Sequence, residues 1–202
     1  IAIGRIAGQY TKSRSSLSEP YHEQHIPTYR GDSVNAEQAG AGREPQAERL
    51  LQAYSHAKNA LSHLPATLYT SPEALRLPFE PALLRKVAAG TYLSSAHMPW
   101  VGMRTAGKTA PMELLRGVLN PIGIKVGPNM QTEDLVDLLQ WINPTAIPGR
   151  VQLILRLGSE GVSHLPAYLQ AVDHSKQAVA WWLDPMHGNG RFLQEKAVKT
   201  RY

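Results

Sequence analysis

A histidine in residues 184–189, Asp-Pro-Met-His-Gly-Asn, has the chemistry to bind a metal ion. The segment follows the apolar run of residues 178–183, which favours a buried strand. An imidazole at the end of a buried strand lies where α/β proteins keep their active sites, so His187 is a candidate metal ligand. The alternative is a turn histidine whose ring is satisfied by neighbouring groups, the commoner role of a histidine beside glycine and asparagine.

Two earlier apolar runs each carry one cation near their end. Lys125 lies in residues 122–128, and Arg156 lies in residues 151–158. A cation in a buried run is costly without an anionic partner, so each could bind a phosphate or carboxylate at the end of its strand. A structural ion pair is the alternative for either residue. Their repetition on successive strands, with His187 on the next, favours one convergent anion-binding site.

The bulk composition is that of an ordinary globular protein with a substantial core. The chain has 202 residues, of which 43% are hydrophobic and 18% are charged. It contains no cysteine, which excludes disulfides and thiolate ligands within these residues. It also has no apolar stretch of transmembrane length and no signal-peptide pattern at its first residues. We therefore expect a cytoplasmic protein without a membrane partner.

The charge of the chain indicates which classes of partner it can bind. The formal net charge is +5 and the isoelectric point is about 9.5, which suits anionic partners. The cations are dispersed along the chain rather than gathered in a patch or tail, and this distribution favours small anions over nucleic acid. A nucleic-acid-binding module is an alternative that the isoelectric point alone supports.

The pattern of apolar residues predicts strands that alternate with helices. Strands are expected at residues 1–7, 91–96, 123–126, 151–157 and 178–183. Helices are expected at residues 44–63, from 71 to about 89, and at 111–119, 132–142 and 163–172. In the first helix the apolar residues recur at helical spacing, and in the fourth Thr132 is expected to act as the cap. Repeated strand–helix order predicts parallel strands joined by crossover helices.

Eight stretches taken together closely resemble class II 3-deoxy-D-arabino-heptulosonate 7-phosphate (DAHP) synthases. They are residues 4–10, 12–15, 29–32, 100–105, 120–128, 148–150, 184–189 and 199–201. Their order and spacing match across almost the whole chain, and both the shikimate-pathway enzymes and the phenazine-pathway branch are similar. The resemblance implies an α/β fold of the TIM type, a (β/α)8 barrel. Residues 1–202 would form one partial barrel domain with about five parallel strands, approximately the second to the sixth.

The resemblance also implies a function. The family members are transferases that condense phosphoenolpyruvate with erythrose 4-phosphate in an aldol-type reaction, the first step towards chorismate and the aromatic amino acids. The cofactor implied is a divalent metal, manganese or cobalt, which would polarise the aldehyde of erythrose 4-phosphate. Neither nucleic acid nor a membrane is implied as a partner, and the full-length protein is expected to be a homo-oligomer.

The matching motifs assign roles to six residues. Arg14, Arg104, Lys125 and Arg156 would bind phosphoenolpyruvate, with a further contact from the backbone N–H of Met103. His187 would bind the metal, and with Lys125 and Arg156 it forms the implied catalytic set. The family's other metal ligands, a cysteine, a glutamate and an aspartate, belong to strands without a counterpart in these residues.

Two of three departures from the family pattern, Met103 and residues 106–112, motivate a second hypothesis. Ser13 replaces a proline, Met103 replaces an acidic residue, and residues 106–112 differ from the usual continuation of that motif. A degenerate, noncatalytic homologue that keeps a phosphate-binding or oligomerisation role is therefore the alternative to an active synthase.

Overall fold

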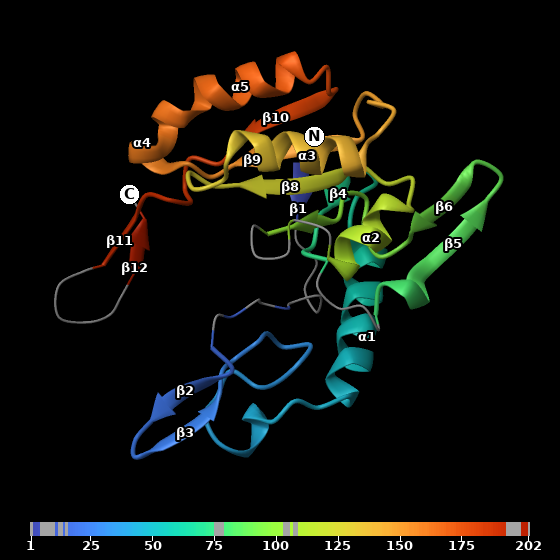
Figure 1. The fold of residues 1–202 in the computed structure, drawn as a ribbon. Coiled ribbons are helices and arrows are strands. Elements are labelled where there is room, and N and C mark those ends of the chain that lie inside the picture. Colours follow the sequence, from blue (N-terminus) through green and yellow to red (C-terminus); the bar gives the residue numbers. More distant parts are fainter. Residues whose placement is uncertain are drawn as a thin grey trace. The chain divides into compact units, whose positions relative to one another are not determined.

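The protein is described here by a computed structural model, which covers residues 2–4, 11, 14, 16–74, 79–102, 106, 109–192 and 199–201 (Figure 1). The chain divides into two compact units, Ile1–Pro99 and Trp100–Tyr202. No helix within the described ranges is both long and apolar enough to cross a membrane.

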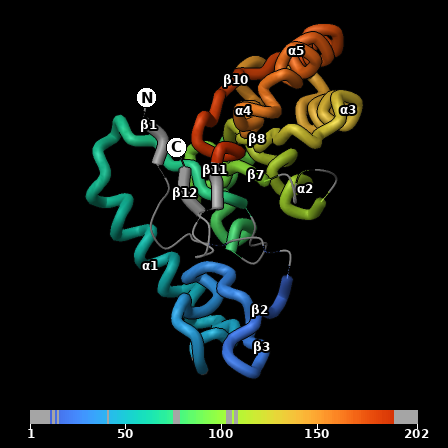
Figure 2. The backbone as a smooth tube through the Cα atoms, turned by 90° about the vertical axis from the view of Figure 1, so that its left-hand side faces the viewer, coloured from blue at the N-terminus to red at the C-terminus, as the bar shows by residue number. Residues whose placement is uncertain are grey.

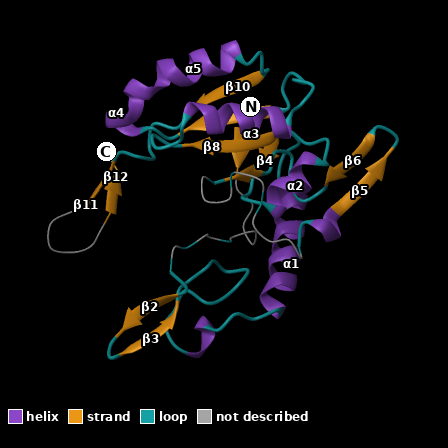
Figure 3. Cartoon of the chain, viewed as in Figure 1, coloured by secondary structure: helices purple, strands orange, loops and turns teal. Residues whose placement is uncertain are grey.

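The second unit is built around a parallel sheet of four strands in the order β10-β9-β8-β7. The strands are β7 (Trp100–Val101), β8 (Ile122–Val126), β9 (Val151–Leu155) and β10 (Val179–Leu183). The connections contain α2 (Ala110–Arg116), α3 (Thr132–Ile142), α4 (Gly158–Gly161), η3 (Val162–His164) and α5 (Leu165–His174). Figure 3 shows the resulting alternation of strands and helices. A mixed α/β fold with parallel strands and crossover helices is therefore confirmed.

The two faces of this sheet differ in burial. On β8 the side chains of Ile122, Ile124 and Val126 are fully buried, and on β9 the alternate side chains from Val151 to Leu155 are buried as well. Helices α3 and α5 lie side by side along the sheet and supply the matching apolar residues of the core (Figure 2). Because successive strand residues point to opposite faces, Lys125 and Arg156 lie on the other face.

Arg150 ties the start of this sheet to the preceding helix. Its guanidinium is buried and donates to the carbonyl oxygens of Leu115 at 2.8 Å, Arg116 at 3.2 Å, and also Asn120. The carbonyl groups of Leu115 and Arg116 belong to the last turn of α2, where carbonyl groups find no donor within the helix. Arg150 therefore caps α2 and holds the turn that leads into β8.

The second unit ends in a small antiparallel pair, β11 (Gly190–Phe192) with β12 (Lys199–Arg201).

The predicted strand and helix at residues 123–126 and 132–142 agree closely with β8 and α3. One detail differs, because Gln131 takes the N-cap position of α3 and Thr132 is its first helical residue. The expectation that Thr132 caps the helix was wrong, and no side chain caps this helix end.

Among its described residues, the first unit contains three separate pairs of strands. β1 (Ala2–Gly4) pairs in parallel with β4 (Leu68–Thr70), and β2 (Ser18–Tyr21) forms a hairpin with β3 (Gln24–Pro27). A second hairpin joins β5 (Leu84–Val87) to β6 (Gly90–Leu93). The remaining elements are η1 (Ala41–Arg43), α1 (Glu48–His63) and η2 (Pro81–Leu83).

Helix α1 is confirmed, but its burial differs from the simple pattern of its large apolar residues. The small side chains of Ala53 and Ala57 are buried, whereas Leu51, Tyr54 and Leu61 are exposed within the described structure. The helical spacing of the apolar residues therefore predicts the helix correctly but does not predict which face of it is buried. Periodicity reports secondary structure, and burial depends on what packs against it.

The helix predicted from residue 71 to about 89 was wrong, whereas the strand predicted at residues 91–96 is confirmed for residues 91–93, which belong to β6. A helix was expected to about residue 89, but residues 84–87 are strand β5, and residues 75–78 lie outside the described part. Proline at 81 cannot continue a helix from residue 77, because it lacks the backbone donor. The expected strand at 91–96 is the second arm of an antiparallel hairpin, so β7 at Trp100–Val101 is the parallel strand instead.

Candidate functional site

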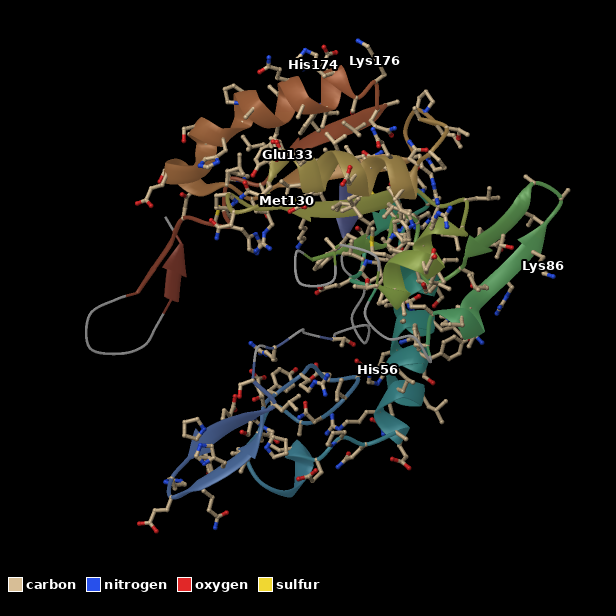
Figure 4. All side chains as sticks on the ribbon, viewed as in Figure 1. His56, Lys86, Met130, Glu133, His174 and Lys176 are labelled. Atoms are coloured by element: carbon tan, nitrogen blue, oxygen red, sulfur yellow. The ribbon has the colours of Figure 1, made fainter. Side chains whose placement is uncertain are left out.

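The candidate site lies where β8, β9 and β10 end. Lys125 is the penultimate residue of β8, Arg156 follows β9 directly, and Asp184 follows β10 directly. The backbone N–H of Arg156 donates to Val126 O at 2.8 Å, and that of Asp184 donates to Leu155 O at 2.8 Å. The sheet ladder thus continues to the charged residues and brings them to the same edge. Figure 4 labels Met130 and Glu133 at this end of the unit, where α3 begins, and His174 and Lys176 at the far end of α5.

The register places these charges on one face. Lys125 is opposite Ile154 in the parallel pairing of β8 with β9, and Arg156 lies two residues beyond Ile154. Arg156 is half-buried and its Nε is 3.9 Å from Asp184 Oδ2. The sequence hypothesis that Lys125 and Arg156 converge is thereby supported by their shared face and edge.

His187 is held by Asp184, a partner that the sequence analysis had not assigned. His187 Nδ1 lies 2.5 Å from Asp184 Oδ2, while the backbone N–H groups of Met186 and His187 donate to Asp184 Oδ1 at 3.0 and 3.1 Å. Burial would raise the pKa of Asp184, but these hydrogen bonds and the charge of His187 outweigh burial and lower it. An ionised carboxylate only accepts, so Nδ1 carries a proton, and when the ring loses its second proton the lone pair is left on Nε2.

The loops after β9 and β10 contact each other next to this histidine. Gly158 and Gly188 have φ values of 70° and 90°, and a Cβ on Gly188 would lie 2.7 Å from Gly158 N. Asn189 Oδ1 accepts the backbone N–H of Ser159 at 2.7 Å, and its amide donates to Pro185 O at 2.8 Å. Both positions need glycine, because both have φ in the left-handed region and the two backbones lie too close together to leave room for a Cβ. The contact fixes the loop that carries His187.

The loop after β8 is also fastened. The hydroxyl of buried Tyr168, on α5, lies 3.0 Å from Gly127 O and 2.8 Å from Met130 O. A phenol has one proton, so these carbonyls share a single donor. Burial raises the pKa of Tyr168, which keeps that proton in place. The loop that follows Lys125 is thus tied to the helix that precedes β10.

Lys125 also has an aromatic neighbour. Its Nζ lies 3.4 Å from the centroid of the Trp100 ring, which comes from β7. Both residues project from the face of the sheet opposite the buried Ile124, because Trp100 pairs with Gly123.

Arg14 belongs to the first unit. Its Nε donates to Tyr29 O at 2.8 Å, and its side chain is exposed. The Tyr29 hydroxyl in turn donates to Asp32 Oδ1 at 2.5 Å. Burial and the hydrogen bond to Asp32 raise the pKa of Tyr29 to about 12. Arg14 is therefore oriented by the backbone of a well-bonded turn, with its guanidinium facing solvent.

The network of this turn was missed by the sequence analysis. Asn35 is fully buried, accepts from the Arg30 N–H at 2.8 Å and donates to the carbonyls of Thr28 and Arg43 at 3.0 and 2.8 Å. Arg43 is buried as well and binds Glu19 Oε1 at 2.5 Å. No local sequence signal distinguishes these buried polar residues from exposed ones, because their partners lie in other segments.

Two predicted site residues, Met103 and Arg104, lie outside the described residues. Within the described ranges, no group of three His, Cys, Asp or Glu residues is arranged to hold a metal ion. His187 fits a single ligand position, since its ring is oriented by a carboxylate as metal-bound histidines usually are. The described part therefore offers one ligand and its support, and does not by itself make up a metal centre.

Comparison with known proteins identifies the family. Residues 1–68 and 65–202 match the class-II DAHP synthetase family. A probable phospho-2-dehydro-3-deoxyheptonate aldolase of Pseudomonas fluorescens is 38% identical over 205 residues, covering 94% of this chain and 51% of the relative. A phospho-2-dehydro-3-deoxyheptonate aldolase of Neurospora crassa is 31% identical over 278 residues, covering 100% of this chain and 57% of the relative. A probable chloroplastic one of Catharanthus roseus is 47% identical over 125 residues, covering 60% of this chain and 25% of the relative.

The chain spans about half the length of the first two relatives. The Neurospora alignment has 278 positions although the chain has 202 residues, so that relative carries internal residues without a counterpart here. The two family matches meet at residues 65–68, between α1 and β4. Since these matches together cover the whole chain, the protein belongs to the class-II DAHP synthetase family.

Proposed function

We propose that this chain contributes the phosphoenolpyruvate site of a DAHP synthase, which condenses phosphoenolpyruvate with erythrose 4-phosphate. The observation that carries the proposal is the placement of Lys125 and Arg156 on one face, at the carboxyl edge of adjacent parallel strands. Phosphoenolpyruvate bears a phosphate and a carboxylate, and two cations at one edge match such a dianionic ligand. Names of the relatives support the same reaction.

The residues divide between binding and chemistry. Lys125, a compact charge with three donors, suits a single phosphate or carboxylate oxygen, while Arg156 can bind two oxygens with its planar fork. Arg14 and Arg104 complete the binding of phosphoenolpyruvate in this proposal, with the backbone N–H of Met103. Asp184 keeps Arg156 and His187 in place, and the interlocked glycines hold the loop in which His187 lies.

His187 would provide one ligand of a divalent metal, manganese or cobalt. When bound, such a metal supplies Lewis-acid polarisation of the aldehyde of erythrose 4-phosphate. The role of this chain's own residues is to present the Nε2 lone pair of His187 in a fixed direction and to hold the anionic groups of phosphoenolpyruvate. The remaining ligands must come from residues outside the described part.

We further propose that residues 1–202 form approximately the second to sixth strands of a (β/α)8 barrel. The four parallel strands in the order β10-β9-β8-β7 and their crossover helices support this arrangement. The face of the sheet that carries Lys125 and Arg156 would be the barrel interior. Neighbouring strands at the edges would then be supplied by the rest of the fold, in a homo-oligomeric cytoplasmic enzyme.

The test is to bind phosphoenolpyruvate to variants of the natural protein, at the length its source makes. Lys125→Ala and Arg156→Ala should each weaken binding, measured by calorimetry, by about tenfold or more, because each removes a charge-assisted contact. Lys86→Ala, at an exposed strand position, is the matched control and should bind normally. Unchanged binding in both site variants would refute the proposal.

The same proteins distinguish an active synthase from a noncatalytic homologue. An active synthase consumes phosphoenolpyruvate only when erythrose 4-phosphate and a divalent metal are both present. Binding of phosphoenolpyruvate without such turnover in the natural protein would favour the degenerate homologue, which the replacement at Met103 suggests.

A further inference from the structure

Trp100 makes an unusual contact with a proposed substrate-binding residue. The ammonium nitrogen of Lys125 lies 3.4 Å from the centroid of its indole ring. A cation over an aromatic face within about 6 Å is attracted by the ring's quadrupole, most strongly for tryptophan. The two side chains come from different strands, so the contact is made by the sheet and not by local sequence.

The sheet leaves space for this contact. Trp100 in β7 is opposite Gly123 in β8, and Lys125 is two residues further along on the same face. A Cβ on Gly123 would lie 2.8 Å from Trp100 Cβ and 3.2 Å from Ile154 Cδ1. Gly123 therefore allows the tryptophan to lie against β8, where its ring meets the lysine.

We propose that Trp100 is a positioning residue for Lys125 in binding phosphoenolpyruvate. This inference rests on the proposed function and adds a specific role to it. A lysine has four flexible side-chain bonds, and ordering them on binding costs conformational entropy. The indole face holds the ammonium in one place before the anion arrives, which reduces that cost.

An aromatic support differs from a carboxylate in a way that suits an anion site. A carboxylate beside Lys125 would compete with the substrate for the same charge, whereas a ring quadrupole attracts the cation without cancelling its charge. Arg156 shows the other arrangement, with Asp184 Oδ2 at 3.9 Å from its Nε. The two cations thus contact different kinds of neighbour, Lys125 an aromatic ring and Arg156 a carboxylate.

The experiment is a double-mutant cycle on phosphoenolpyruvate affinity, measured by calorimetry on the natural protein. Its members are Trp100→Leu, Lys125→Ala and the double variant. Trp100→Leu should weaken binding by about tenfold in the presence of Lys125. In the Lys125→Ala background the same change should have little further effect, because the ring acts through the lysine.

Two more variants separate positioning from folding. Trp100→Phe keeps a weaker aromatic face and should bind with an affinity between those of the natural protein and Trp100→Leu. Trp141→Leu removes another indole that lies under a cation, Arg116 at 5.3 Å, but on α3, and should leave affinity unchanged. The phenylalanine variant also gives a result if the leucine variant does not fold.

The outcomes are distinct. An equal loss from Trp100→Leu with and without Lys125, or no loss at all, would overturn the positioning role. Equal affinities of Trp100→Phe and Trp100→Leu would overturn it as well. If Lys125→Ala itself binds phosphoenolpyruvate normally, the assignment of Lys125 in the proposed function fails first, and the inference about Trp100 fails with it.

Discussion

Replacing Asp184 with asparagine should disrupt the orientation of His187 with almost no change in shape. Asparagine keeps one oxygen, which can still accept the backbone N–H groups of Met186 and His187 at the 3.0 and 3.1 Å seen for Asp184 Oδ1. The group that faces His187 Nδ1 then becomes an amide NH2. A donor there requires Nδ1 to accept, so the ring proton moves to Nε2. That tautomer cannot offer Nε2 to a metal.

The magnitude follows from the contacts that are lost. The 2.5 Å hydrogen bond from Nδ1 to Asp184 is charge-assisted, and such bonds contribute about 1.5–3 kcal/mol. Loss of a residue that supports a metal-bound histidine typically reduces metal affinity by about 10–100-fold, which is the same range of free energy. The ion pair with Arg156 adds little, since its 3.9 Å separation is long and both groups are partly exposed. We expect manganese to bind about 30-fold more weakly.

The assay is a manganese titration of the natural protein and its variants, with free manganese measured by electron paramagnetic resonance. Asp173→Asn, the same chemical change on the exposed side of α5, is the control and should bind as the natural protein does. His187→Ala should lose more affinity than Asp184→Asn. Normal binding by Asp184→Asn together with weak binding by His187→Ala would refute the orienting role of Asp184. Normal binding by both would remove His187 from the metal site.

Three further predictions concern stability. Arg150→Ala should lower the free energy of unfolding by about 3 kcal/mol, because it removes the guanidinium hydrogen bonds to the carbonyl groups of Leu115, Arg116 and Asn120. A lower urea midpoint with an unchanged slope would show this, and an unchanged midpoint would contradict it. Gly188→Ala should lower the free energy of unfolding by about 2 kcal/mol or more, since the φ of Gly188 is 90° and the new Cβ would lie 2.7 Å from a backbone nitrogen. Gly117→Ala is the control, because its Cβ would lie 3.5 Å from the nearest atom, and its melting temperature should be close to that of the natural protein. Burial raises the pKa of Glu80, although the hydrogen bond from Ser95 at 2.6 Å lowers it, so the folded state holds this proton more tightly than the unfolded chain. The stability from that proton is present below the ordinary glutamate pKa of about 4.3 and is lost as pH rises through the raised pKa. Glu80→Gln should therefore melt at a higher temperature than the natural protein at neutral pH, but not near pH 4. Equal melting temperatures at neutral pH would argue against a buried charge at Glu80.

The second unit was largely predictable because its signals are local. Residues 122–126 and 151–155 are apolar runs without helical spacing, as strands with a buried face should be, and 132–142 shows clear helical periodicity. The cations Lys125 and Arg156 stood out because charge is rare at such positions. Strand polarity then brings both to one edge.

The hairpin arm at residues 84–87, where a helix was predicted, was not predictable in the same way. Leu84–Val87 has no strong pattern of its own, and its strand exists because Gly90–Leu93 pairs with it across a short turn. A strand is stabilised by its partner more than by its own residues, so local propensity could not choose between helix and hairpin there. The exposed leucines of α1 show the same limit for burial.

For this protein the sequence alone determined which chemical groups stand at the ends of the parallel strands, because strand length, alternation and chain direction are properties of each segment. It also determined the family, through long motifs in a characteristic order along the chain. The tertiary structure decided what each group touches. The indole under Lys125, the backbone contact between Gly158 and Gly188, and the Tyr168 hydrogen bonds all join segments brought together by sheet register and crossover packing. Such pairings depend on how whole elements meet, and no local spacing encodes them.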